Sequence, residues 1–229
     1  MKSTAVTTSG GIIKRLLFLF LFSITAFARE EVECIGPEGA NKFIVYLHGM
    51  DTNPPSAQEL QNRVVLSSLA KKLNVRFALP RAADKCPTHL NQFCWVWWTK
   101  TADELKKVTQ SIAEASRTCF PGKKFSTLGF SNGGAALNVF IRLCIKNNFQ
   151  EIITVGAAGD WSGSDPKNLN GCSPKFTALI GSEDEANQKP VRDFVSHLLM
   201  LKARAELIEY KGGHQLLHDA LEPIIKRIR

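Results

Sequence analysis

The sequence predicts a single α/β domain: a mainly parallel sheet of about six strands with helices on both faces. Short apolar runs rich in β-branched and aromatic residues alternate with segments of helical periodicity, and no linker-like stretch divides them. The composition agrees, because 44% of the residues are hydrophobic and 22% are charged, close to the average of globular domains. These values exclude a disordered chain, a collagen-like repeat and a protein with several membrane spans.

Six apolar runs predict the strands, at 43–47, 75–79, 125–130, 151–155, 176–180 and 205–210. Ser56 as an N-cap, Thr101 with Glu104 as a capping box and Pro190 in a first turn mark three helix starts. The predicted helices cover about 56–73, 101–117, 131–146, 190–204 and 216–228. Residues 81–100 are predicted to be irregular. Because helices or long loops separate the strands, parallel pairing is expected.

The first 28 residues have the pattern of an export signal. Three basic residues accompany an apolar run from Leu16 to Phe22, and a small-x-small sequence ends at Ala28. The run is far shorter than the ~20 apolar residues that span a bilayer, so a retained anchor is the weaker alternative. We therefore predict a signal peptide over 1–28, a folded domain over 29–229, and a secreted or periplasmic protein without a stable membrane anchor.

The net charge is modest once this segment is removed. Loss of three basic and no acidic residues lowers the formal charge from +8 to +5. The lysines are scattered and are not interleaved with aromatic residues that could stack on bases, so no nucleic-acid partner is predicted.

All six cysteines follow the predicted cleavage site, and an even number in an exported chain favours disulfides. Six cysteines allow fifteen pairings. The eight-residue separation of Cys86 and Cys94 suits a local disulfide, and the other pairings stay open. Cys144, on the core side of a predicted helix, fits a buried free thiol as an alternative. No Cys or His spacing typical of zinc sites occurs, and no metal or other cofactor is predicted.

The segment from Gly129 to Gly133 fits the G-x-S-x-G nucleophile elbow and lies between a predicted strand and a predicted helix. So sharp a turn requires a strained backbone at Ser131, and side chains two residues to either side would collide with the strand and the helix. The turn presents the serine hydroxyl at the carboxyl edge of the sheet, where the helix N-terminus favours negative charge. The alternative is a glycine-rich turn in which Ser131 only caps the helix.

Two further polar residues complete a catalytic triad in the chain order Ser131, Asp184, His214, each just beyond a predicted strand. His214 would take the proton of Ser131 during attack on a carbonyl, and Asp184 would fix the histidine tautomer. Other candidates for the acid are Asp160, beyond the preceding strand, and the neighbours Glu183 and Glu185. Gly181, three residues before Asp184, favours Asp184.

The loop after the first strand, His48-Gly49-Met50, occupies the place where an oxyanion donor is expected. We predict that the backbone N–H groups of Met50 and Asn132 form the oxyanion hole. His48 is expected to shape this loop and not to transfer protons.

With these residues the chain resembles the α/β-hydrolase superfamily from about Phe43 to its C-terminus. Its compact size, the plain His48-Gly49 loop and the tryptophan-rich segment before a helix are most similar to small secreted esterases of the polyhydroxybutyrate depolymerase, feruloyl esterase and dienelactone hydrolase type. The loop continues as Met50-Asp51 and lacks the His-Gly-Gly-Gly sequence of hormone-sensitive-lipase-like enzymes, which argues against that branch. The short chain before Phe43 leaves room for only about six strands.

The tryptophans of the 81–100 segment lie on the side of the sheet that would carry the site. Trp95, Trp98 and Trp161 are candidates for a substrate-binding wall, and the alternative is that Trp95, Trp97 and Trp98 cover the end of the core. The short connection after the 151–155 strand leaves no room for a large lid. An open cleft fits bulky or polymeric esters as well as small ones.

The sequence therefore predicts an exported, metal-independent serine hydrolase that cleaves carboxylic esters. A serine peptidase, an amidase or a thioesterase on the same fold would use the same triad. A non-catalytic binding protein of this fold is the remaining alternative, although a binding module has no need of a strained elbow.

Overall fold

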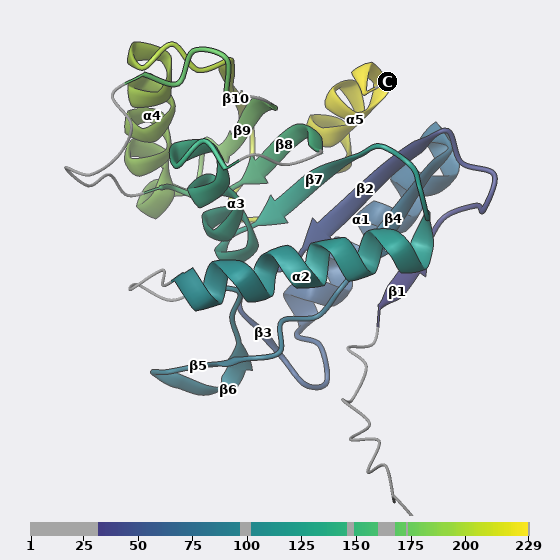
Figure 1. The fold of residues 1–229 in the computed structure, drawn as a ribbon. Coiled ribbons are helices and arrows are strands. Elements are labelled where there is room, and N and C mark those ends of the chain that lie inside the picture. The colour runs from purple at the N-terminus through teal and green to yellow at the C-terminus, as the bar shows by residue number, and fades with distance from the viewer. Residues whose placement is uncertain (1–31, 97–101, 146–148, 160–167, 173, 229) are drawn as a thin grey trace, which may run out of the picture.

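The protein is described by a computed structural model over residues 32–96, 102–145, 149–159, 168–172 and 174–228 (Figure 1). Within these ranges the main sheet has seven strands in the order β1-β4-β2-β7-β8-β9-β10. Every neighbouring pair is parallel except β1 and β4. The strands are β1 (Glu33–Ile35), β2 (Lys42–Leu47), β4 (Val75–Leu79), β7 (Phe125–Phe130), β8 (Phe149–Val155), β9 (Lys175–Gly181) and β10 (Ala205–Tyr210).

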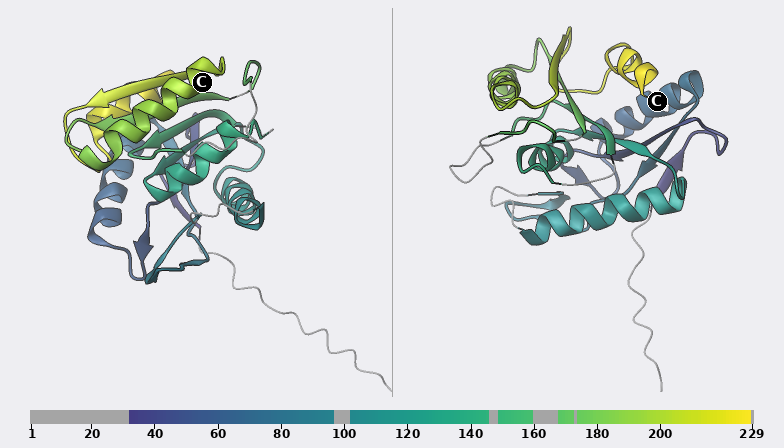
Figure 2. Two further views of the ribbon diagram at one scale, coloured as in Figure 1. Left: turned by 90° about the vertical axis from the view of Figure 1, so that its left-hand side faces the viewer. Right: turned by 45° about the horizontal axis from the view of Figure 1, so that its top comes forward.

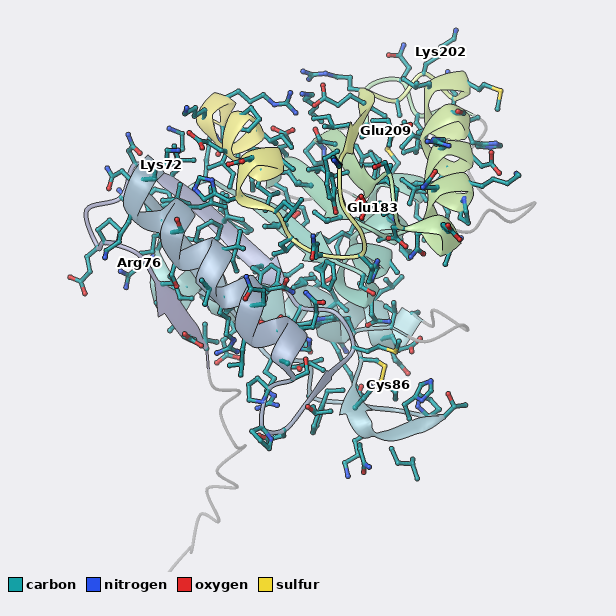
Figure 3. The ribbon with its side chains drawn as sticks, turned by 180° about the vertical axis from the view of Figure 1, so that it is seen from behind. Lys72, Arg76, Cys86, Glu183, Lys202 and Glu209 are labelled. Carbon is teal, nitrogen blue, oxygen red and sulfur yellow. A yellow bond between two sulfur atoms is a disulfide. The ribbon has the colours of Figure 1, made fainter. Side chains whose placement is uncertain are left out.

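Helices cover both faces of this sheet, as predicted (Figures 1 and 2). They are α1 (Ala57–Leu73), α2 (Ala102–Cys119), α3 (Asn132–Arg142), α4 (Glu185–Met200) and α5 (His218–Arg227). Side chains such as Ile112, Phe140 and Phe194 pack α2, α3 and α4 into one core layer. Leu66 of α1 and Ile225 of α5 belong to the layer on the opposite face, and these two helices lie nearest the viewer in Figure 3. No helix in the described residues is long and apolar enough to cross a membrane.

The parallel register brings the carboxyl ends of the central strands to one edge. Leu47 of β2 pairs with Gly129 of β7, which pairs with Thr154 of β8. At the far side, Gly181 of β9 pairs with Tyr210 of β10. Residues that directly follow these strands therefore gather at the same edge, although they are far apart in the sequence.

A small second sheet extends from this edge, in the order β3-β6-β5 (Figure 1). Its strands are β3 (Asp51–Thr52), β5 (Lys85–Cys86) and β6 (His89–Phe93). The prediction of an irregular 81–100 segment is wrong over β5 and β6. Most of their side chains are exposed and carry no apolar periodicity, so antiparallel pairing and a disulfide define this hairpin instead.

All six cysteines form disulfides: Cys34–Cys119, Cys86–Cys94 and Cys144–Cys172. The local Cys86–Cys94 pairing is confirmed, and Figure 3 labels Cys86 in the small sheet. The alternative of a free thiol at Cys144 is wrong. Cys144 has a φ of 51° and follows the end of α3, so α3 stops at Arg142 and not at residue 146 as predicted.

Other parts of the fold also differ from the sequence prediction, since β1 was not predicted, β8 begins two residues earlier than expected, and α4 ends at Met200 and not at residue 204. The short strand β1 contains no apolar run from which the sequence could predict it, and it brings the number of strands in the main sheet to seven. Helix α4 begins at Glu185, five residues earlier than predicted, because the N–H groups of Asn187 and Gln188 both donate to the carbonyl oxygen of Asp184. Pro190 therefore lies inside the helix. The Ser56 cap is confirmed, with its hydroxyl accepting from the Glu59 N–H at 3.2 Å. Thr101, the first residue of the predicted capping box, lies outside the described residues.

Candidate active site

Ser131 occupies a sharp turn between β7 and α3. Its φ of 50° and ψ of −116° put a non-glycine residue in a strained conformation. A Cβ on Gly129 would lie 2.6 Å from the backbone of Gly133, and a Cβ on Gly133 would lie 2.2 Å from the carbonyl oxygen of Leu47. Both glycines are thus required by close backbone contacts. The Ser131 side chain makes no capping hydrogen bond to α3, which argues against the reading of a simple helix cap.

Asp184 and His214 form a hydrogen-bonded pair at the ends of β9 and β10. The Asp184 Oδ2 atom lies 2.7 Å from His214 Nδ1. The Asp184 side chain is only 5% exposed, whereas that of His214 is 36% exposed. The neighbours Glu183 and Glu185 are both exposed, and Asp160 lies outside the described residues. Among the described candidates for the acid, Asp184 is the one that the structure pairs with His214.

One ring contact and two close approaches to glycines place the elbow, His214 and the loop after β2 near one another. The rings of Phe130 and His214 have centroids 4.8 Å apart, and Phe130 directly precedes Ser131. A Cβ on Gly49 would lie 3.2 Å from the Cβ of Ser131. A Cβ on Gly156, which follows β8, would lie 2.7 Å from His214 Nδ1. The His48–Met50 loop, the elbow and the Asp184–His214 pair therefore share one edge of the sheet.

Sequence reasoning missed three residues that support this pair. The Asn187 amide nitrogen donates to Asp184 Oδ1 at 2.8 Å, so both carboxylate oxygens are engaged. The Tyr210 hydroxyl lies 2.7 Å from the carbonyl oxygen of Gln215 and ties down the loop that carries His214. Gly156, with a φ of 61°, leaves space for the His214 ring. The three-residue spacing of Asn187 from Asp184, one turn into a helix, is the only signal that the sequence offered.

Both ring nitrogens of His48 are hydrogen-bonded to the backbone. Its Nε2 accepts the N–H of Ala82 at 3.1 Å, so Nδ1 carries the proton and donates to the Gly49 carbonyl oxygen at 2.5 Å. Burial lowers the pKa of His48 to about 4, which keeps the ring neutral. A neutral imidazole with both ring nitrogens hydrogen-bonded holds the loop after β2 in place.

The predicted oxyanion and substrate residues fall in different surroundings. Met50 is 41% exposed at the end of the His48 loop. Asn132 is the first residue of α3, where backbone N–H groups have no partner within the helix. Trp95 is 5% exposed and donates its indole N–H to the carbonyl oxygen of His48 at 3.0 Å, which favours the reading that it covers the core. Trp98 and Trp161 lie outside the described residues.

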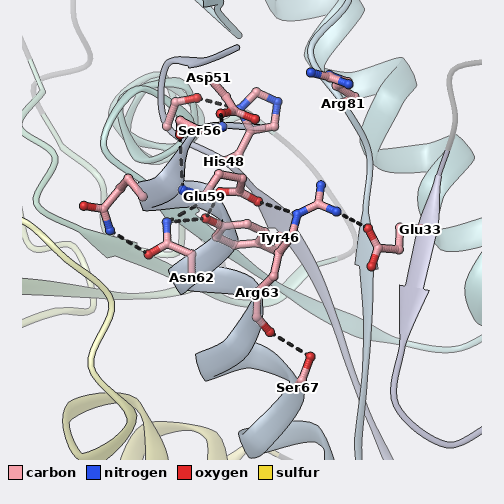
Figure 4. Close-up of polar contacts among 12 residues, drawn as sticks. Glu33, Tyr46, His48, Asp51, Ser56, Glu59, Asn62, Arg63, Ser67 and Arg81 are labelled. Atoms are coloured by element: carbon pink, nitrogen blue, oxygen red, sulfur yellow. Dashed lines mark hydrogen bonds and ion pairs between the residues drawn. The ribbon is translucent and has the colours of Figure 1, made fainter. Parts of the chain in front are cut away.

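A buried cluster of polar side chains lies between β2 and α1 (Figure 4). The Tyr46 hydroxyl donates to Glu59 Oε2 at 2.9 Å, and Asn62 donates to the Tyr46 oxygen at 3.0 Å. Arg63 lies 3.3 Å from the other oxygen of Glu59 and also contacts Glu33 on β1. Glu59 is 3% exposed, and this burial raises its pKa from a usual 4.5 to about 7. The nearby Asp51 adds to the rise, and Tyr46 and Arg63 oppose it.

Glu59 should make stability depend on pH. Its pKa is raised in the folded state, so the folded protein binds more protons between pH 4.5 and 7, and the free energy of unfolding falls as the pH rises through that window. At roughly 1.4 kcal/mol per pKa unit, the wild type should lose up to about 3 kcal/mol of its free energy of unfolding across this window. We expect the Glu59→Gln variant, which cannot titrate there, not to show this loss. Urea unfolding at pH 5 and pH 8 measures the change in the free energy of unfolding, and Glu38→Gln, at an exposed glutamate, is the control. Wild-type and Glu59→Gln curves that shift in parallel would contradict the prediction.

One cluster of ligand-type side chains lies elsewhere in the described residues. His218, Asp219 and Glu222, at the start of α5, present ligand atoms within 4.8 Å of one another. Lys72 and Lys226 each place an ammonium nitrogen 2.7 Å from a Glu222 oxygen. These two positive charges oppose a cation, and we assign no metal to this cluster.

Comparison with known proteins gives a structural relationship only. The sequence matches no protein-family model and no curated protein. A carboxylesterase from Mesorhizobium loti superposes with a TM-score of 0.66 at 15% identity, covering 86% of this chain and 92% of the other. Esterase PE8 gives 0.61 at 17% identity, covering 86% and 95%. Acyl-protein thioesterase 2 from Zea mays gives 0.58 at 17% identity, covering 86% and 96%. The chain therefore has the α/β-hydrolase fold, as the resemblance implied.

Proposed function

We propose that this chain is an exported serine hydrolase that cleaves carboxylic esters with Ser131, His214 and Asp184 as its triad. The observation that carries the proposal is the 2.7 Å contact between Asp184 and His214, at the same sheet edge as a strained serine elbow. Solved structures of the same fold include carboxylesterases, which supports hydrolysis. Three disulfides fit a secreted or periplasmic protein. The proposed signal peptide, 1–28, lies outside the described residues.

The proposed reaction proceeds in two displacements. His214 takes the Ser131 proton as the serine oxygen attacks the ester carbonyl, and Asp184 stabilises the imidazolium that forms. The backbone N–H groups of Met50 and Asn132 stabilise the oxyanion. Collapse of this intermediate releases the alcohol, which takes the proton from His214 and leaves acyl-Ser131. Water then attacks the acyl group by the same route and regenerates the serine.

Thioester hydrolysis is the second candidate, because one structural neighbour is an acyl-protein thioesterase. A thioester would use the same triad, with a thiol as the leaving group. Small and polymeric esters both remain within the proposal, and Trp98 and Trp161 are the proposed contacts for the acyl or alcohol group.

Hydrolysis of p-nitrophenyl esters from acetate to palmitate by the chain 29–229 tests the proposal, together with labelling by a fluorophosphonate probe. Turnover and labelling together would support an esterase, and the preferred acyl length would measure its pocket. Labelling without ester turnover would point to a peptidase, an amidase or a thioesterase, which acyl-thiol and peptide substrates would separate. A folded protein that does neither would refute the catalytic proposal and favour a binding protein.

Gly156→Ala should lower kcat for a p-nitrophenyl ester by about 100-fold, since roughly 1 Å of misplacement can cost that much. The added Cβ would lie 2.7 Å from His214 Nδ1 and displace the ring. Gly122→Ala is the matched control, because Gly122 also has a positive φ, of 73°, but nothing lies within 4 Å of the added Cβ. Both variants bear a backbone penalty, and only Gly156→Ala should lose activity. Equal activities would show that Gly156 does not set the position of His214.

A further inference from the structure

The proposed oxyanion hole takes its two N–H donors from distant parts of the chain. Met50 comes after β2, whereas Asn132 comes directly after Ser131 in the elbow that follows β7. Donors of this kind stabilise an oxyanion only when they are held in advance within hydrogen-bond distance of one point. The spacing between the two segments must therefore be fixed by other groups.

The Asn132 side chain contacts the backbone of the segment that follows the β5–β6 hairpin. Its Oδ1 accepts the Trp95 backbone N–H at 2.8 Å, and its Nδ2 donates to the Val96 carbonyl oxygen at 2.8 Å. Both halves of the amide are thus engaged with two consecutive residues. This arrangement fixes Trp95 relative to the first turn of α3.

The Trp95 side chain continues the contact to the other donor segment. Its indole N–H donates to the His48 carbonyl oxygen at 3.0 Å, one residue before Gly49, and its ring centroid lies 5.0 Å from that of His48. The His48 ring in turn bonds to Ala82 and Gly49. A continuous set of contacts therefore runs from Asn132 through Trp95 to the loop that ends in Met50.

We propose that His48, Trp95 and the Asn132 side chain form an oxyanion bracket, which sets the distance between the two backbone segments that stabilise the oxyanion. Trp95 and the Asn132 amide are positioning residues in this inference, which rests on the proposed function. The bracket gives Trp95 a role in the rate of the reaction and not in substrate binding. It also explains why a large ring with a polar N–H is buried at this edge.

Two substitutions cut the bracket at different places. Trp95→Phe removes the indole N–H and keeps an aromatic ring, and Asn132→Ala removes the amide and keeps the backbone N–H. We expect each to lower kcat by about 10- to 100-fold, below the roughly 10²- to 10³-fold cost of deleting a whole donor, with KM changed less than about twofold. Because both act on the same spacing, the double variant should lose less than the product of the single effects.

A phenylboronic acid, which adds to serine as a charged tetrahedral adduct, gives a second readout. Its inhibition constant should rise in each variant by about the factor by which kcat/KM falls. Thr177→Val is the control for lost stability. It removes a buried hydroxyl that lies 2.6 Å from Glu151 and 2.9 Å from Arg227, near the opposite end of the strands, and should leave kcat unchanged.

The outcomes separate the bracket from the proposed function. An inactive wild type would refute the hydrolase proposal and the bracket with it. An active wild type with unchanged kcat in Trp95→Phe and Asn132→Ala would overturn the bracket alone. A rise in KM at constant kcat in Trp95→Phe would also overturn the bracket and would indicate that Trp95 contacts the substrate. If the Trp95→Phe variant fails to fold, the kcat of the Asn132→Ala variant tests the bracket alone. The Asn132 side chain is only partly buried, so its removal should be tolerated by the fold.

Discussion

Replacing Ser131 with alanine should reduce kcat for ester hydrolysis by about 10⁵-fold or more, since deletion of the nucleophile in a serine protease costs on the order of 10⁶-fold. The substitution removes Oγ, so no acyl-enzyme can form, while the remaining N–H groups give only residual catalysis. The fold should be retained, because alanine has the same Cβ as serine at a backbone φ of 50°. Kinetics with p-nitrophenyl acetate, fluorophosphonate labelling and circular dichroism measure the three expectations.

Ser182→Ala is the matched control for this substitution. Ser182 is exposed and directly follows β9 at the same edge of the sheet. Its variant should keep both ester turnover and fluorophosphonate labelling. If Ser131→Ala instead retained turnover and labelling, the nucleophile would be another residue, and the elbow would be a structural turn.

Replacing Asp184 with asparagine should lower kcat by about 10⁴-fold near neutral pH, the size of effect known for the equivalent change in a serine protease. An amide in place of Oδ2 can donate to His214 Nδ1 and hold the ring in the wrong tautomer. The geometry should survive, since asparagine has nearly the same shape and Asn187 can keep its contact with Oδ1. Steady-state kinetics and the inhibition constant of phenylboronic acid test this expectation.

Glu183→Gln is the control, because it removes a neighbouring carboxylate that is exposed. It should leave kcat within about twofold of wild type, as expected of a surface charge. The pair of variants also tests the other candidates for the acid. Loss of activity in Glu183→Gln, or its retention in Asp184→Asn, would move the acid to Glu183, Glu185 or Asp160.

The parts of the site that could be predicted are those set by local sequence. A Cβ on Gly129 would meet the backbone of Gly133 within the turn, and a Cβ on Gly133 would meet the backbone at the end of β2, so the sharp turn leaves a recognisable glycine pattern around Ser131. Parallel strands bring their carboxyl ends together whatever the loops contain, and this is why Asp184 and His214 could be chosen by their place after a strand.

The remaining parts depend on contacts between distant segments. Trp95 meets Asn132 and His48 across separations of 37 and 47 residues, which no periodicity records. The hairpin of β5 and β6 has few apolar residues, and it depends on pairing and on the Cys86–Cys94 disulfide. The other two disulfides could not be chosen among the pairings that six cysteines allow.

The strand β1 has a consequence for how the protein can be made. It pairs antiparallel with β4 at the margin of the sheet, and the Cys34–Cys119 disulfide joins it to the end of α2. Unpaired strand margins are templates for aggregation, so β1 shields β4 from other chains. The disulfide closes a loop of 85 residues, worth roughly 4.5 kcal/mol by the chain-entropy relation. Synthesis in a reducing compartment would leave that loop open, and we expect insoluble protein there and soluble protein after oxidation.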